Sequence, residues 1–425
     1  MRHGVNSKGN MVVKITFSTF KFSLLALLAI SWVTVSQRAS AQEFDLDKRQ
    51  EKVTNAANAT NTPSGATIYY ANTDHIPKLD VIIPVFDPNI PDKDKKEVWP
   101  EVRRAEANRF ALMLKQALEK SNAFGAVRVT PDQSGFGELY VHGKILKANG
   151  EDVKLEISVN DIRGPRHSLL KNKKFEYRVQ ESFHTSPRTR GTDAYMPIFD
   201  EIAVEIVRKL SSLSKKKVKE LNGLSALTEM RFANMFGPEY FGKYLKEKKS
   251  SVTLAGFPSE NDPVYEKIRT MRIQEQLFVD QLQPHYENFA YSMNPHYYAW
   301  QEFALPFAKE KRKAKAAATW KTIGAIAIAG AGVASGSNKL MTTGLVVGGV
   351  LIASSISDYR SKNESSKALD EMGDTLNLDM GTQVVEFEGV QTRLEGDAVE
   401  QFQGYRMHLV DIYEREATPD ILISD

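Results

Sequence analysis

The chain has 425 residues, of which 42% are hydrophobic and 26% are charged, the composition of a soluble globular protein with two or three domains. The 56 basic and 53 acidic residues nearly balance, at a net charge of +3, and composition gives no argument for nucleic-acid binding. The absence of cysteine excludes disulfides, thiolate metal sites, cysteine nucleophiles and the acylated cysteine of a bacterial lipoprotein.

Residues 1–41 have the pattern of a secretory signal peptide. A basic N-terminal stretch precedes an apolar run over residues 22–35, and Ala39-Ser40-Ala41 places small residues where a signal peptidase reads them. The apolar run is shorter than the roughly 20 residues of a membrane span, which favours cleavage after Ala41 over an uncleaved anchor. We therefore predict an exported protein of the bacterial cell envelope, in the periplasm or on the periplasmic side of the outer membrane.

Residues 42–75 are polar and are predicted to form a tether, whereas residues 76–213 are predicted to form a compact α+β domain. A mostly apolar run at 79–86 is typical of a buried strand. Pro100 occupies a first-turn position and opens a helix predicted over 101–121. Arg103, Arg104 and Glu106 of this helix are expected on a solvated face, and contact with a partner is the alternative.

Alternating apolar and polar residues then predict antiparallel strands with one wet face. The alternation runs over 138–146 and 153–159, and Asn149-Gly150 between them tolerates the positive φ of a hairpin turn. The remaining predicted elements of the domain are strands at 126–129 and 173–179 and a helix at 195–213.

Three stretches of this domain resemble the α/β module of bacterial envelope proteins. They are LDVIIPVF (79–86), NAFGAVRVTPD (122–132) and GELYVHGKILKANGEDVKLEISVNDIRG (137–164), with LYVHGKI carrying most of the match. The families concerned include the curli secretion protein CsgG, the N-terminal domain of TolB and auxiliary lipoproteins of ABC transporters. The resemblance covers about residues 76–213 and implies a periplasmic interaction module without catalysis. The chain departs from the lipoproteins in lacking the acylated cysteine, and from the curli pore in lacking a pair of long alternating hairpins.

Residues 214–315 are predicted to be a helical, aromatic-rich region. A helix begins at Asp262-Pro263, and Pro284 and Pro295 are expected to interrupt the helical sequence beyond it. The aromatic residues between 286 and 307 favour a helical core, and a belt that contacts a partner or lipid headgroups is the alternative.

Residues 358–425 are predicted to form a C-terminal β-hairpin and helix. The strands are expected at 383–387 and 390–394, around Glu388-Gly389, and Asp397 is expected to cap the helix.

Residues 316–357 form a Gly/Ala-rich apolar segment, predicted to be a helical hairpin of the glycine-zipper type. Two apolar runs, 323–334 and 340–356, flank a polar connection, and their small residues allow close approach of helix backbones. Burial in the protein or an oligomer and insertion into a membrane remain alternatives. The predicted contact residues are Gly324, Gly330, Gly332, Gly344, Gly348 and Gly349. The basic residues predicted to contact lipid headgroups are Lys311, Arg312, Lys313 and Lys315.

Known catalytic patterns such as H-E-x-x-H and G-x-S-x-G do not occur in the sequence, and the histidines are scattered. The glycines at 330–336 do not have the spacing of a dinucleotide-binding turn. We therefore predict no catalytic residues, cofactor or metal. The expected partners are envelope proteins, membrane lipid and further copies of the chain, without nucleic acid. The predicted function is a non-catalytic assembly, secretion or scaffold accessory. An oligomeric pore or channel component and a periplasmic hydrolase are the alternatives.

Overall fold

The computed structural model describes residues 56–61, 67–91, 98–329, 383–387, 390–394 and 397–417. Within these residues the fold class is α+β, as predicted. The predicted signal peptide lies outside the described residues. So does the polar connection of the predicted Gly-rich hairpin, together with its second apolar run.

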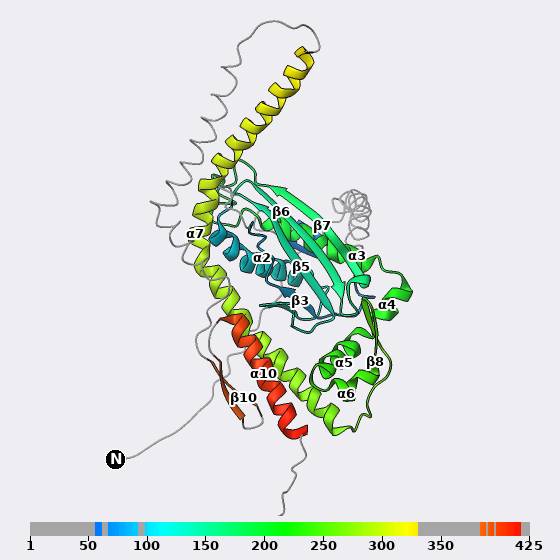
Figure 1. Cartoon of the computed structure of the whole chain (residues 1–425). Coiled ribbons are helices and arrows are strands. Elements are labelled where there is room, and N and C mark those ends of the chain that lie inside the picture. Colours follow the sequence, from blue (N-terminus) through cyan, green and yellow to red (C-terminus); the bar gives the residue numbers. More distant parts are fainter. Residues whose placement is uncertain are drawn as a thin grey trace, which may run out of the picture. The chain divides into compact units, whose positions relative to one another are not determined.

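A five-stranded mixed sheet forms the framework of the α+β domain (Figure 1). Its order is β4-β3-β5-β6-β7: β3 runs parallel to β4 and β5, whereas β5, β6 and β7 are antiparallel. The strands are β3 (Val81–Pro84), β4 (Val127–Thr130), β5 (Leu139–Ala148), β6 (Asp152–Asp161) and β7 (Ser168–Arg178). Alternate residues of β5 and β6 are buried, which confirms the sheet pattern predicted from the sequence.

Helices α2 (Pro100–Lys120) and α3 (Met196–Ser211) pack against the sheet and against each other. Pro100 lies in the first turn of α2, where a helix needs no backbone N–H donor. Phe110 of α2 and Phe199 of α3 are fully buried, and their ring centroids lie 5.2 Å apart. The core of the domain therefore lies between these two helices and the sheet.

The second half of the predicted tether is ordered as a hairpin. Strand β1 (Ala56–Asn61) pairs antiparallel with β2 (Thr67–Ala71). Tyr70 of β2 is 1% exposed, and its hydroxyl donates to the carbonyl of Ala117 in α2 at 3.3 Å. The expected tether is thus wrong for residues 56–61 and 67–75, because Tyr70 is buried and Ile68 and Ala71 of the same strand also pack against the core.

Beyond α3 the chain is mainly helical, as predicted, with one unpredicted hairpin. The elements of this stretch are α4 (Lys215–Leu221), α5 (Leu224–Phe236), α6 (Pro238–Phe241), β8 (Leu245–Lys248) and β9 (Ser251–Leu254). Single 3₁₀ turns occur at Pro165–His167 and Gly242–Tyr244. Strands β8 and β9 pair with each other and with no strand of the main sheet.

A single helix, α7 (Pro263–Ala329), replaces the interrupted helices expected in the region before residue 316. It begins where predicted, with Asp262 Oδ1 accepting from the backbone N–H groups of Val264 and Tyr265. It then passes through Pro284 and Pro295 without a break. Packing against α2, β4, α5 and α10 (Ala398–Ala417) compensates for the hydrogen bonds that the prolines remove. In the part of the chain that the structure describes, no helix combines the length and apolar character that crossing a bilayer requires.

The aromatic residues of α7 confirm the predicted helical core over most of its length. Tyr286, Tyr297 and Trp300 are all at most 6% exposed, whereas Tyr291 is 79% exposed. The expectation of an aromatic core is therefore right, with one prominent side chain outside it.

The C-terminal elements match their predictions. Strands β10 (Gln383–Phe387) and β11 (Val390–Leu394) pair as a hairpin. Asp397 caps α10: its Oδ1 accepts from the N–H of Glu400, whose carboxylate accepts from the N–H of Asp397. α10 packs on α7 through Tyr405, whose ring is stacked 4.3 Å from that of Phe278.

Candidate functional site

Of the glycines predicted to contact membrane or other copies of the chain, only Gly324 belongs to the part of the chain that the structure describes. Gly324 lies within α7, close to its end. The other glycines of the set, namely Gly330, Gly332, Gly344, Gly348 and Gly349, lie outside the described residues. The predicted boundary between the aromatic-rich region and the Gly-rich segment, at residue 315, falls inside α7.

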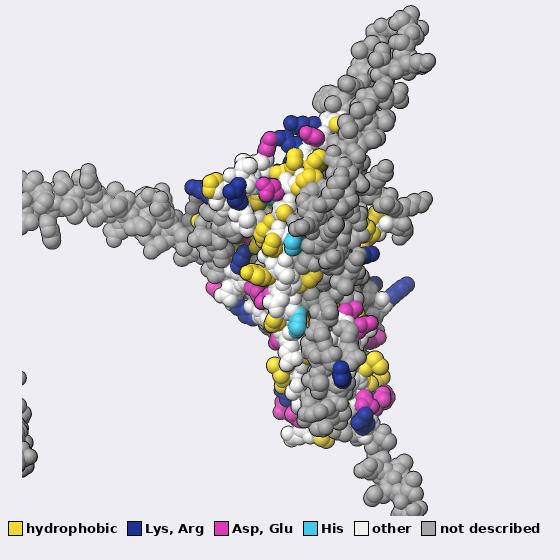
Figure 2. All heavy atoms as spheres, turned by 90° about the vertical axis from the view of Figure 1, so that its left-hand side faces the viewer, with side chains coloured by type: hydrophobic (Ala, Val, Ile, Leu, Met, Phe, Trp, Pro, Cys, Tyr) yellow, Lys and Arg dark blue, Asp and Glu magenta, His cyan; other side chains and the backbone are white. Residues whose placement is uncertain are grey.

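The predicted basic cluster is partly engaged by carboxylates of the protein itself. Arg312 binds Glu151, with Nη2 and Oε1 at 2.8 Å, and Lys309, which precedes the predicted set, forms an ion pair with Glu181. Lys311 and Lys313 are exposed, and the side chain of Lys315 lies outside the described set. On the face shown in Figure 2, basic and acidic side chains lie close together near the upper end, where α7 leaves the sheet in Figure 1.

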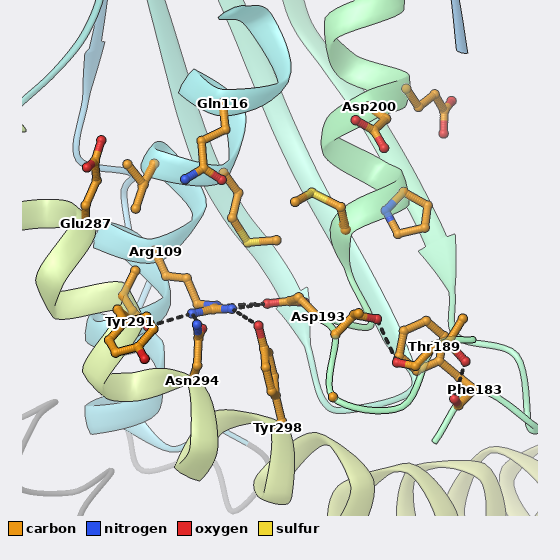
Figure 3. A pocket seen from close by; sticks show the side chains of 18 of the residues that line it. Arg109, Gln116, Phe183, Thr189, Asp193, Asp200, Glu287, Tyr291, Asn294 and Tyr298 are labelled. Carbon is orange, nitrogen blue, oxygen red and sulfur yellow. Dashed lines mark hydrogen bonds and ion pairs between the residues drawn. The ribbon is translucent and has the colours of Figure 1, made fainter. Parts of the chain in front are cut away.

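Arg109 of α2 is the centre of a buried polar cluster that joins α2 to α7. Its Nε donates to Asp193 Oδ2 at 2.8 Å, and its Nη1 donates to Asn294 Oδ1. Its Nη2 donates to Tyr298 Oη at 3.3 Å (Figure 3). We call Arg109, Asp193, Asn294 and Tyr298 the Arg109 clamp.

The charged pair of the Arg109 clamp is buried and neutral overall, whereas Asn294 and Tyr298 are half-buried. Arg109 is 4% exposed and Asp193 5% exposed, and Nη1 of Arg109 also donates to the carbonyl of Ala290 at 3.2 Å. Burial lowers the pKa of Arg109, but the charge of Asp193 and the two adjacent tyrosines outweigh burial and raise it. The guanidinium therefore stays charged and has its donors engaged within the protein, which makes it a structural tie and leaves little capacity for an incoming anion.

Glu106, one turn earlier on α2, is buried beside the clamp. It is 1% exposed, accepts from Tyr297 Oη of α7 at 2.8 Å and lies 3.2 Å from Nε of Arg103. Burial raises the pKa of Glu106 to about 7, and Arg103 and the Tyr297 hydroxyl offset this only in part. Arg103 and Glu106 were expected on a solvated face, and this is wrong: only Arg104 is partly exposed. Arg103 also donates to the carbonyls at the end of β5, which explains why it is buried.

The turn between β5 and β6 makes a second junction with α7. Gly150 has a φ of +87°, and a Cβ on it would lie 2.5 Å from the Cβ of Ala304 in α7. Its N–H donates to Tyr195 Oη at 2.6 Å. The next residue, Glu151, is 3% exposed and is the partner of Arg312. The predicted Asn-Gly turn thus also serves as a contact with α7.

A cavity of about 820 Å³ lies among α2, α3, β2 and α7, with the Arg109 clamp in its wall (Figure 3). The apolar residues that line it include Ile68, Leu112, Met113, Met196, Pro197 and Val204. Its polar lining includes Gln116, Asp200, Glu201, Glu287 and Asn288. The volume and the mainly apolar lining are typical of small-molecule sites, which occupy about 300–1,000 Å³.

Asp200 is the unusual polar group of this cavity. It is 6% exposed, and its Oδ1 has no hydrogen-bond partner among the described residues. The nearest cation, Lys120, places its Nζ 4.0 Å from Oδ1. Burial raises the pKa of Asp200, and Lys120 offsets this only in part. A buried carboxyl without a donor is costly, so it favours any ligand that supplies one.

The described residues contain no group of three or more histidine or acidic side chains placed to hold a metal ion. No protein-family profile, curated protein or solved structure matches the chain. Functional inference therefore depends on this chain's own geometry and sequence patterns.

Proposed function

We propose that the protein is an exported, non-catalytic accessory of the bacterial cell envelope. In this proposal, α7 holds the Gly-rich segment 316–357 in a defined orientation to the α+β domain, and that segment contacts membrane or further copies of the chain. The α+β domain binds envelope proteins. The observation that carries the proposal is the continuity of α7, which is fixed on the domain and runs as one helix to Ala329 inside the first apolar run.

Two junctions along α7 support a rigid connection. The Arg109 clamp engages Asn294 and Tyr298, and Glu151 engages Arg312 further along the helix. A helix rises about 1.5 Å per residue, so residues 313–329 extend about 25 Å beyond Arg312. A segment held in this way has a fixed orientation relative to the α+β domain, whereas a flexible tether would leave that orientation free.

The sequence supplies the remaining support. The signal-peptide pattern of residues 1–41 indicates export. The small residues of the apolar runs favour close helix contacts, and the resemblance to CsgG-type and TolB-type modules favours protein partners in the envelope.

Fractionation of the native host tests the proposal. The intact protein is followed through periplasmic release, a carbonate wash and detergent extraction, beside a variant in which a Gly/Ser linker of equal length replaces 316–357. We expect the intact chain to require detergent or to run as an oligomer, and the linker variant to leave with the periplasm as a smaller species. Detergent dependence together with ring-shaped oligomers would favour the pore alternative.

A matched pair of substitutions separates close helix packing from simple hydrophobicity. Gly344→Leu with Gly348→Leu should reduce assembly or membrane association, whereas Gly344→Ala with Gly348→Ala keeps both residues small and should change little. An intact protein that is monomeric and freely released from the periplasm would overturn the proposal, as would a Leu pair that behaves like the Ala pair.

A further inference from the structure

The cavity between α2, α3, β2 and α7 has the features of a built binding site. It is lined by α2, α3, β2, α7 and the segment 183–193 between β7 and α3, is open to solvent on one side, and has a mostly apolar surface. Asp200 and Gln116, on α3 and α2, place polar groups at one part of the wall, and the Arg109 clamp closes another (Figure 3). An apolar body can pack against such walls, while the polar groups select its head group.

The charge of the lining selects for a cation. Asp200, Glu201 and Glu287 contribute three carboxyl groups to it. Of the described residues that line the cavity, Arg109 is the only cationic one, and Asp193 neutralises it within the clamp. Lys115 and Lys120, outside the lining, each lie 4.0 Å from one of these carboxylates, Glu287 and Asp200, and offset part of their charge. With Glu201 added, the lining keeps an excess of negative charge, which favours a cationic ligand over an anionic one.

Asp200 identifies the position of the cationic group. Its Oδ1 is buried and lacks a hydrogen-bond donor, and the 4.0 Å to Lys120 Nζ is too long for a hydrogen bond. A ligand ammonium that hydrogen-bonds to the carboxyl of Asp200 at the cavity wall would supply a donor and compensate the charge. Charge-assisted hydrogen bonds of this kind are roughly twice as strong as neutral ones.

We propose that this cavity binds a small amphiphilic amine, with its apolar body against the cavity walls and its ammonium group hydrogen-bonded to Asp200. The site is independent of the envelope role proposed above, since it depends on the α+β domain and α7 alone. The volume of about 820 Å³ is that of a small-molecule pocket.

Three probes of similar size and different charge test the site on the intact protein. They are 2-phenylethylamine, the neutral 2-phenylethanol and the anionic 3-phenylpropanoate, which are water-soluble and can be titrated calorimetrically at neutral pH. We expect the amine to bind about tenfold more tightly than the alcohol, and the acid to bind more weakly than both. Equal affinity for amine and alcohol would overturn the proposal.

Substitutions at the cavity assign the preference to Asp200. Asp200→Asn should lower amine affinity about tenfold, to the level of the alcohol, and leave alcohol binding unchanged. Glu119→Gln, at a 43% exposed carboxylate of α2 outside the cavity lining, is the matched control and should leave amine affinity unchanged. If Asp200→Asn retained the full preference for the amine, the assignment would be wrong.

Two further measurements guard against an indirect effect. The midpoint temperature of thermal unfolding should be the same for Asp200→Asn as for the wild type, or higher, because the substitution removes no hydrogen bond at Oδ1. Val204→Trp, which fills the cavity from α3, should weaken binding of the amine and the alcohol alike. Unaltered binding to Val204→Trp would place the probes elsewhere and overturn the proposal.

Discussion

Buried charges of α2 are paired with opposite charges, one on the same helix and one beyond it. Arg109 is paired with Asp193, and Arg103 with Glu106, while tyrosines of α7 complete both groups. Hydrogen bonds with this geometry are directional, so they fix the position of α7 on the domain more narrowly than apolar packing would. Loss of one partner from such a pair leaves an uncompensated buried charge, which is strongly destabilising.

Glu106 is expected to make folding stability depend on pH. Its pKa rises from an ordinary 4.5 to about 7 in the folded protein, so the folded state binds this proton more tightly than the unfolded chain. The resulting stability is fully present below pH 4.5 and is lost as the pH rises to about 7. A shift of this size corresponds to roughly 3 kcal/mol. Urea unfolding between pH 4 and 8 measures the effect.

Glu106→Gln should flatten this pH profile, because glutamine cannot ionise but can still accept from Tyr297. Glu119→Gln is the matched control on the same helix, where the carboxylate is 43% exposed, and it should leave the profile of the wild type intact. A Glu106→Gln protein with the wild-type slope would show that another group is responsible.

The sequence could not reveal these residues as a cluster. Arg109 and Asp193 are 84 positions apart, and Glu106 and Tyr297 are 191 apart. Arg and Glu at neighbouring helix positions are usually solvated, which is why Arg103 and Glu106 were expected at the surface. Asp200 gives no local signal either, since its lack of a partner follows only from how α2 and α3 pack.

Elements whose signals are local were predicted well. The alternation in β5 and β6 and the Asn149-Gly150 turn specify a hairpin without any distant contact. The Asp397 and Glu400 pair likewise specifies the start of α10 through its own backbone N–H groups.

Elements that depend on distant packing were missed. The β1–β2 hairpin packs on the domain through Tyr70, Ile68 and Ala71, and the short β-forming run TIYYA was its only local signal. Pro284 and Pro295 were expected to interrupt a helix by intrinsic preference, but packing of α7 along the domain overrides that preference.

Gly150 allows a test of the contact between the β5–β6 turn and α7. Alanine at Gly150 would adopt a strained positive φ, and its Cβ would also lie 2.5 Å from Ala304 Cβ. The strained backbone costs about 1–2 kcal/mol and overpacking about 1–3 kcal/mol more. We expect Gly150→Ala to destabilise the protein by about 3 kcal/mol in chemical denaturation.

Gly191→Ala separates the two contributions. Gly191 has a φ of +77°, and a Cβ there would meet no atom within 4 Å, so only the backbone strain applies. Its expected cost is about 1 kcal/mol. If the two substitutions lowered the free energy of unfolding by similar amounts, α7 would be able to move away from the turn at Ala304, and this junction would not be rigid.

At the scale of the whole molecule, α7 is the element that links the α+β domain to the Gly-rich segment. It contacts α2 and β4 of the domain and also α5 and α10. Its last described residues belong to the first apolar run. A rigid helix transmits rotation as well as distance, because each residue turns the helix by about 100°. The proposed role therefore predicts that assembly depends on helical phase.

Insertions after Ala314, which lies just beyond the Arg312–Glu151 contact, test this dependence. Two added alanines rotate the subsequent residues by roughly 200°, whereas seven alanines rotate them by roughly 700°, within about 20° of the original facing. If α7 sets the facing of residues 316–357, the two-residue insertion should reduce oligomer formation or membrane association in the host. The seven-residue insertion should preserve it, although it moves the segment further, by about 10 Å. Equal behaviour of the two insertions would identify α7 as a spacer in which orientation has no role, and the function would then reside in the α+β domain and the Gly-rich segment separately.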